Sequence, residues 1–214
     1  VRTEELEPLP EHEPQREISY MIRLTLMNHE NEQKTAVLDL PATEERMQEV
    51  QAELDAPEWF DAQFISCDAI VPQLNTILTD VEDLPRINEL AHSLLKLKAN
   101  GQLTKFKAVV GATQCESLDD VFDRLEKLPQ YCFEAKIRDK DALVRDELEF
   151  VLGGKDADLI YKHLNCEAYA EDVLKQYGAE ITPYGMVNRE DVGPLHEPIP
   201  EQKQEQAQEP QMGM

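Results

Sequence analysis

The stretch that decides the fold of the N-terminal part runs from residue 20 to residue 40 and reads YMIRLTLMNHENEQKTAVLDL. From Tyr20 to Leu26 every second side chain is strongly apolar, a period of two that is typical of a strand with one buried face. Residues 28–33 are polar and predict a turn, and residues 35–40 predict a second strand. Together these segments predict a β-hairpin.

The residues that follow add one helix and one more strand to this hairpin. Thr43 can cap a helix over 44–54, and two glutamates in its first turn suit the positive end of the helix dipole. Residues 62–68 are typical of a third strand. We therefore expect a small antiparallel sheet with one helix over residues 18–66.

The middle of the chain has a different pattern, with apolar residues at helical spacing. A helix is expected to begin at or near Asp83 and to end at Asn100 and Gly101. Residues 103–112 fit a short helix or a strand, and a helix is the favoured interpretation. Residues 67–112 are therefore expected to form a helical unit.

The last part predicts a mixed unit over residues 113–190. Its expected elements are a helix capped by Ser117, a strand over 131–137, a helix from Asp139 or Asp141 to Leu152, short helices over 156–164 and 167–177, and a closing strand over 180–187. The chain as a whole is expected to be an α+β protein of small units in sequence.

The net charge is strongly negative, with 44 acidic against 21 basic side chains and a formal value of −23. Residues 18–188 carry 32 acidic and 17 basic side chains, so the excess is not confined to the ends. A surface of this kind repels nucleic acids and anionic membranes and attracts basic partners. Acidity that serves only to keep the chain dissolved is the alternative explanation.

Both ends and the cysteines bear on the cellular setting. Residues 1–17 and 191–214 are rich in Pro and Glu and are expected to be disordered. No apolar run approaches the roughly 18–20 residues that cross a bilayer, and no leader pattern opens the sequence. The four cysteines form no Cys-x-x-Cys pair, which favours reduced thiols and a cytoplasmic protein.

Recognisable catalytic and metal-binding motifs are not found. Gly153 and Gly154 follow a predicted helix instead of leading into one from a strand, so they are interpreted as a helix end and not as a phosphate-binding loop. His163 and Cys166 are too few for a zinc site. We predict no catalytic residue, metal or cofactor, and no nucleic-acid binding, because the basic residues are dispersed.

Acidic side chains crowd the polar faces of the helices expected after residue 113. Asp119 and Asp123, for example, lie one helical turn apart, about 6 Å along the axis. A DNA duplex presents one phosphate per roughly 3.4 Å on each strand. Rows of carboxylates on successive helices can therefore imitate rows of phosphates, or they can be the solvated faces of ordinary amphipathic helices.

Four sequence blocks, in their order and spacing, carry a resemblance to a known family. They are IRLTLMN…AVLDLPAT, CDAIVPQL…DLPRINELAHSLLKL, SLDDVFDRLEKLPQYCFEAKIRDKDAL and YKHLNCEAYAEDVLKQYGAEITPYGMV. From about Met21 to Val187 the chain resembles the ArdA-type antirestriction proteins, which are acidic DNA mimics carried by mobile genetic elements. The INELA and EAYAED patches are the most specific part of the match.

The resemblance implies an elongated protein of three small units in tandem, similar to bent B-form DNA in shape and charge. It implies that the protein occupies the DNA groove of type I restriction–modification enzymes, blocks cleavage and sometimes modification, and forms a homodimer through its C-terminal part. The residues to which it assigns the mimic surface are Asp119, Asp120, Asp123, Glu126, Asp139, Asp141, Asp146, Glu147, Glu149, Asp156, Asp158, Glu167, Glu171 and Asp172.

Two other kinds of function stay open on the sequence. The chain can be an acidic adaptor or sequestering protein for another basic, DNA-binding partner. An enzyme is the third interpretation, because a nucleophile and its base need not be neighbours in the sequence.

Overall fold

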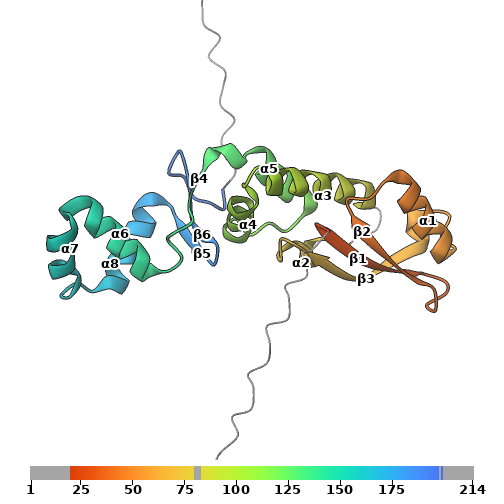
Figure 1. The fold of residues 1–214 in the computed structure, drawn as a ribbon, viewed down its shortest axis with the longest axis horizontal. Helices are drawn as coiled ribbons and strands as arrows, with labels where there is room; N and C mark the ends of the chain where they lie inside the picture. The colour runs from red at the N-terminus through yellow and green to blue at the C-terminus, as the bar shows by residue number, and fades with distance from the viewer. Residues whose placement is uncertain (1–19, 80–82, 198, 200–214) are drawn as a thin grey trace, which may run out of the picture.

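The structure is a computed structural model that describes residues 20–79, 83–197 and 199. It is an elongated α+β protein in which two small three-stranded sheets are joined by helices (Figure 1). The elements follow in the order β1 (Ile22–Asn28), β2 (Thr35–Leu40), α1 (Glu44–Leu54), η1 (Trp59–Asp61), β3 (Ala62–Ala69), α2 (Leu74–Ile77), α3 (Leu84–Ala99), α4 (Leu103–Ala112), α5 (Leu118–Glu126), η3 (Leu128–Gln130), β4 (Tyr131–Glu134), α6 (Lys140–Leu152), α7 (Gly154–Tyr161), α8 (Cys166–Tyr177), β5 (Glu180–Thr182) and β6 (Gly185–Arg189).

The N-terminal sheet confirms the predicted hairpin and third strand. Its order is β2-β1-β3, and both pairings are antiparallel. Leu24 pairs with Leu38 across β1 and β2, and both side chains are fully buried on the face expected from the alternation. Helix α1 begins where predicted, because the hydroxyl of Thr43 accepts a hydrogen bond from the Arg46 backbone N–H at 3.3 Å.

The middle of the chain is helical, as predicted. Helix α3 ends before Asn100, and Gly101 follows with a φ of +70°, a conformation that favours glycine. The segment that fitted either a helix or a strand is the helix α4, and Phe106 and Val109 on it are fully buried. The short helix α2 was not predicted.

Two strand predictions in the C-terminal part are wrong. The strand expected over 131–137 ends at Glu134, because the chain turns there and the Ile137 N–H bonds to the Glu134 carbonyl at 3.2 Å. The single strand expected over 180–187 is a hairpin of β5 and β6. The Thr182 hydroxyl closes this turn by donating a hydrogen bond to the Gly185 carbonyl at 2.8 Å.

The two adjacent glycines also behave differently from one another. Gly153 ends α6 with a φ of +79°, as a helix-end glycine does, whereas Gly154 is the first residue of α7. The helix predicted over 156–164 therefore begins earlier and ends at Tyr161.

Buried apolar side chains form two cores. The first core spans the N-terminal sheet and helices α1 to α5, and it is continuous across residues 66 and 112. The second core lies among α6, α7 and α8. The second sheet, of order β4-β6-β5, stands between them, because Tyr131 and Val187 belong to the first core and Met186 to the second. The division into three units stays a prediction.

The predicted C-terminal tail begins later than its composition indicated. Leu195 and Ile199 are buried in the first core, although they lie in a segment rich in Pro and Glu. Residues 1–17 and 200–214, which are the rest of the predicted disordered ends, lie outside the described residues.

Candidate partner-binding surface

The fourteen predicted carboxylates all reach the surface to some degree. Four of them, Asp120, Asp123, Asp146 and Glu147, are half-buried, and the other ten are exposed. They lie on α5, on the three helices of the second core, and at the residue that caps α6 (Figure 1). Exposure is therefore compatible with the predicted role, and the neighbours of each carboxylate decide how much free charge it offers.

One carboxylate of helix α5 caps the N-terminus of the helix itself. The Asp120 carboxylate accepts hydrogen bonds from the Ser117 hydroxyl at 2.7 Å and the Ser117 N–H at 2.9 Å, while the Ser117 hydroxyl accepts one from the Asp120 N–H. The Ser117 hydrogen bond, opposed by partial burial, lowers the pKa of Asp120. This side chain stabilises the helix start and is only partly available to a partner.

Two more carboxylates of α5 are paired with basic side chains. Asp119 bonds to Arg86 of α3 at 2.5 Å and raises the pKa of that guanidinium. Asp123 pairs with the adjacent, largely buried Arg124 and with Lys127 at 2.6 Å. Glu126 is the carboxylate of α5 that makes no ion pair or hydrogen bond within the described part of the chain.

A shared lysine connects the start of α6 to α8. The ammonium of Lys140 bonds to Glu167 and lies 3.1 Å from Glu171, and these hydrogen bonds raise the pKa of the lysine. Two negative charges therefore surround one positive charge, which leaves a net charge of −1 at this place.

Most of the other carboxylates on α6 and at its cap also interact with neighbouring groups. Asp139 caps the helix by accepting the Ala142 N–H at 2.8 Å. Asp146 bonds to Lys136 at 2.5 Å and raises the pKa of that lysine. Asp141 bonds to Arg145 at 3.0 Å, and the charge of Glu147 raises the pKa of the Tyr177 hydroxyl.

Five exposed carboxylates of the predicted fourteen make no ion pair or hydrogen bond to another residue in the described ranges. We name them the open acids: Glu126, Glu149, Asp156, Asp158 and Asp172. Three of them lie on the end of α6 and on α7, at one end of the molecule (Figure 1). Three of the five open acids thus lie near α7, where the exposed Lys155 and Lys162 offset part of their charge.

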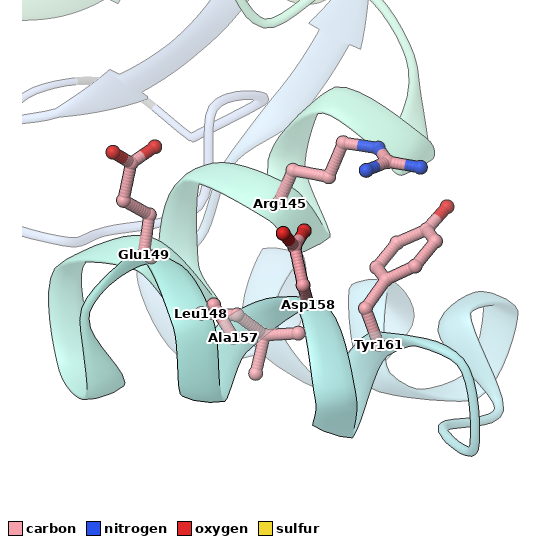
Figure 2. Close-up of a pocket in the computed structure, with 7 residues that line it drawn as sticks. Arg145, Leu148, Glu149, Ala157, Asp158 and Tyr161 are labelled. Carbon is pink, nitrogen blue, oxygen red and sulfur yellow. The ribbon is translucent and has the colours of Figure 1, made fainter.

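A groove of about 300 Å³ lies between α6 and α7 at this end (Figure 2). Leu148 and Ala157 form an apolar floor, and the carboxylates of Glu149 and Asp158 stand beside it. The guanidinium of Arg145 lies over the Tyr161 ring, 3.9 Å from its centre. The groove combines an apolar floor with two carboxylates that can accept basic groups.

Large apolar side chains are exposed around the junction of α6 and α7. We name these residues the apolar tip: Phe150, Val151, Leu152, Leu159 and Ile160. Phe150 is 87% exposed, and Leu159 is 61% exposed. The sequence carried a signal for this surface, since the run Phe-Val-Leu before the two glycines has no polar residue to face the solvent.

The described residues give no sign of a metal site or of a membrane helix. Within residues 20–79, 83–197 and 199, no three His, Cys, Asp or Glu side chains are grouped as metal ligands. Over the same ranges, no helix has both the length and the apolar character needed to span a membrane. The four cysteines are free thiols, and burial raises the pKa of Cys67 to about 11.

The chain matches no protein-family model, and no curated protein sequence matches it. Membership of the antirestriction family therefore stays a hypothesis that rests on the four sequence blocks.

Proposed function

We propose that this protein is a DNA mimic that inhibits a type I restriction–modification enzyme in the cytoplasm by occupying its DNA-binding groove. Inhibition is stoichiometric and has no chemical step. The observation that carries the proposal is an elongated body with carboxylates held on rigid, exposed helices, in a chain of net charge −23. The order of the four sequence blocks supports it independently.

The physical basis of binding is a summed electrostatic field. A DNA-binding groove is lined with basic residues that normally face phosphates, and an acidic surface attracts them over a distance set by ionic strength. The backbone of a helical carboxylate is already ordered before binding, so the entropy lost on binding is that of the side-chain rotamers. The open acids contribute most per residue, because a carboxylate already bonded to a lysine or arginine has its field partly cancelled.

The test is cleavage of unmodified plasmid DNA by several type I restriction enzymes with increasing amounts of the full chain. The expected result is protection that saturates near one inhibitor per DNA-binding site and weakens steeply as salt is raised. Absence of protection at low salt across the enzymes would overturn the proposal. If the chain instead retains an unrelated basic protein from a host lysate, the adaptor function is favoured.

We propose further that the protein is a homodimer joined through the apolar tip. Residues 149–162 hold three acidic and two basic side chains, so this segment is nearly neutral in a strongly acidic chain. Burial of its five exposed apolar side chains by a second copy lowers the free energy and so favours association. Because α7 lies at one end of the molecule (Figure 1), tip-to-tip association keeps the two acidic bodies far apart and limits their repulsion.

A further inference from the structure

The chain does not leave the body of the protein when β6 ends. Residues 190–199, which we name the strap, continue from Arg189 with the first of them bonded back to η3: the Glu190 N–H donates to the Gln130 carbonyl at 3.0 Å. The strap holds no helix or strand among its described residues, yet two of its side chains are buried. A segment without regular structure needs other contacts to hold it in place.

A buried arginine supplies those contacts. The Arg189 side chain is only 3% exposed, and it donates to both carboxylate oxygens of Asp191, at 2.8 and 2.5 Å. Its Nη1 also donates to the backbone carbonyls of Pro194 at 2.8 Å and Glu197 at 3.0 Å. One side chain thus holds three separate points of the strap, and bonds of this charge-assisted kind are among the stronger ones in proteins.

One side of the strap lies against the second-core body. Gly178 ends α8 with a φ of +57°, and a Cβ at this position would come within 3.0 Å of the Val192 carbonyl oxygen and 3.1 Å of that of Gly193. The positive φ and this close approach together favour glycine at the position. Together with Leu174 and Ala179, which pack against the second core, Leu195 and Pro194 of the strap line a shared cavity.

The other side of the strap reaches the first core. Leu195 is 4% and Ile199 is 7% exposed, and both belong to the same buried cluster as Tyr131 and Val187. The strap therefore contacts both bodies. The other covalent connections between them are the turn after β4 and the strand β6, both at the second sheet.

We infer that the strap is an intramolecular clamp that fixes the orientation of the α6–α8 body relative to the first core. With the strap seated, the two bodies move as one. With the strap released, they pivot about the second sheet, because the turn after β4 and the strand β6 are the covalent connections that remain. The inference concerns the free protein and stands whether or not the proposed function holds.

Two truncated chains form a matched pair for the test. A chain that ends at Ile199 loses residues 200–214, with three acidic and one basic side chain. A chain that ends at Glu190 also loses 191–199, with two more acidic side chains and no Lys or Arg. Each step thus removes the same net charge of −2, but only the second step removes the strap.

The measurement is the distance distribution between spin labels on ketone-bearing amino acids placed at Gln48 of α1 and Gln176 of α8, both exposed. The labelled chain is diluted with unlabelled chain so that only distances within one molecule are seen. The full chain and the chain ending at Ile199 are expected to give one narrow distribution. The chain ending at Glu190 is expected to give a distribution broader by about twofold or more, as hinge motion does.

An unchanged narrow distribution in a folded chain that ends at Glu190 would overturn the inference. If that chain does not fold, the substitution Leu195→Ser in the full chain gives the answer, since it weakens the seating of the strap and removes no charge. A broader distance distribution in the Leu195→Ser variant supports the clamp. A distribution as narrow as that of the unsubstituted full chain refutes it. Inhibition of restriction enzymes is not part of the readout, so failure here is distinguishable from failure of the proposed function.

Discussion

Removal of two side chains of the apolar tip is expected to weaken the dimer strongly and to leave the monomer fold intact. Phe150→Ser and Leu159→Ser are the chosen changes, because these residues are 87% and 61% exposed in the single chain. Side chains so exposed contribute little to the stability of the monomer, so the free energy of unfolding should change by less than about 0.5 kcal/mol. The same exposure makes them available to a second copy.

The magnitude follows from the exposed fractions. The two side chains together equal about one and a half fully exposed apolar side chains per protomer and about three in a symmetric pair, at roughly 1.5–3 kcal/mol each when fully buried. If only half of that area is covered, the loss is still about 2–4 kcal/mol. Since each 1.4 kcal/mol is tenfold, the dimer dissociation constant should rise by roughly 30- to 700-fold.

Sedimentation equilibrium over a wide range of concentrations measures this change. The matched control is Phe60→Ser, because Phe60 is 66% exposed but lies in η1, at the opposite end of the molecule (Figure 1). The reasoning is refuted if the unsubstituted chain is monomeric at all concentrations, or if the tip variant and the control associate equally well.

Two further predictions concern the second sheet and the half-buried thiol of Cys67. Gly185→Ala should lower the free energy of unfolding by about 2 kcal/mol or more, because its φ is +150° and a Cβ would stand 2.6 Å from the Glu134 carbonyl oxygen. Urea unfolding measures this loss. The control is Gly101→Ala, where the φ is also positive but the new Cβ meets open space. Burial raises the pKa of Cys67 from about 9 to about 11, so the neutral thiol is favoured in the folded state. The stability that Cys67 contributes should be complete below pH 9 and lost as the pH rises toward 11, and Cys67→Ala should flatten that part of the stability profile.

The parts of the fold that could be predicted are those whose signal is local. The alternation around Leu24 and the Thr43 cap each fix their element through neighbours a few residues away. The β5–β6 hairpin also carried a local signal, because Pro183 and Gly185 interrupt the strand pattern and are typical of a turn. The prediction of one strand gave these two residues too little weight, and the hydrogen bond from the Thr182 hydroxyl to the Gly185 carbonyl closes the turn.

The same limit applies to the candidate surface. Its position on the exposed helices of the C-terminal part could be predicted from the amphipathic pattern, but its pairing could not. Asp119 bonds to Arg86, 33 residues earlier, and Lys140 bonds to Glu167, 27 residues later. The strap was missed because it opens the segment 191–214, which as a whole is rich in Pro and Glu. Leu195 is buried through packing that only the folded chain creates.

The most direct test of the central claim compares two ways of removing five negative charges. In one variant all five open acids are changed to their amides; in the control, five glutamates outside the described residues are changed to glutamine. The control positions are Glu4, Glu5, Glu7, Glu201 and Glu205. Both variants have the same net charge, so only the place of the carboxylates differs.

Protection of DNA against a type I restriction enzyme is then titrated with each variant at fixed salt. At about 0.3–0.5 kcal/mol per exposed carboxylate, the open-acid variant is expected to need roughly 10- to 60-fold more protein, whereas the control should stay close to the unsubstituted chain. Equal inhibition by both variants, with the fold of each verified, would contradict the claim that carboxylates held on these helices stand in for phosphates.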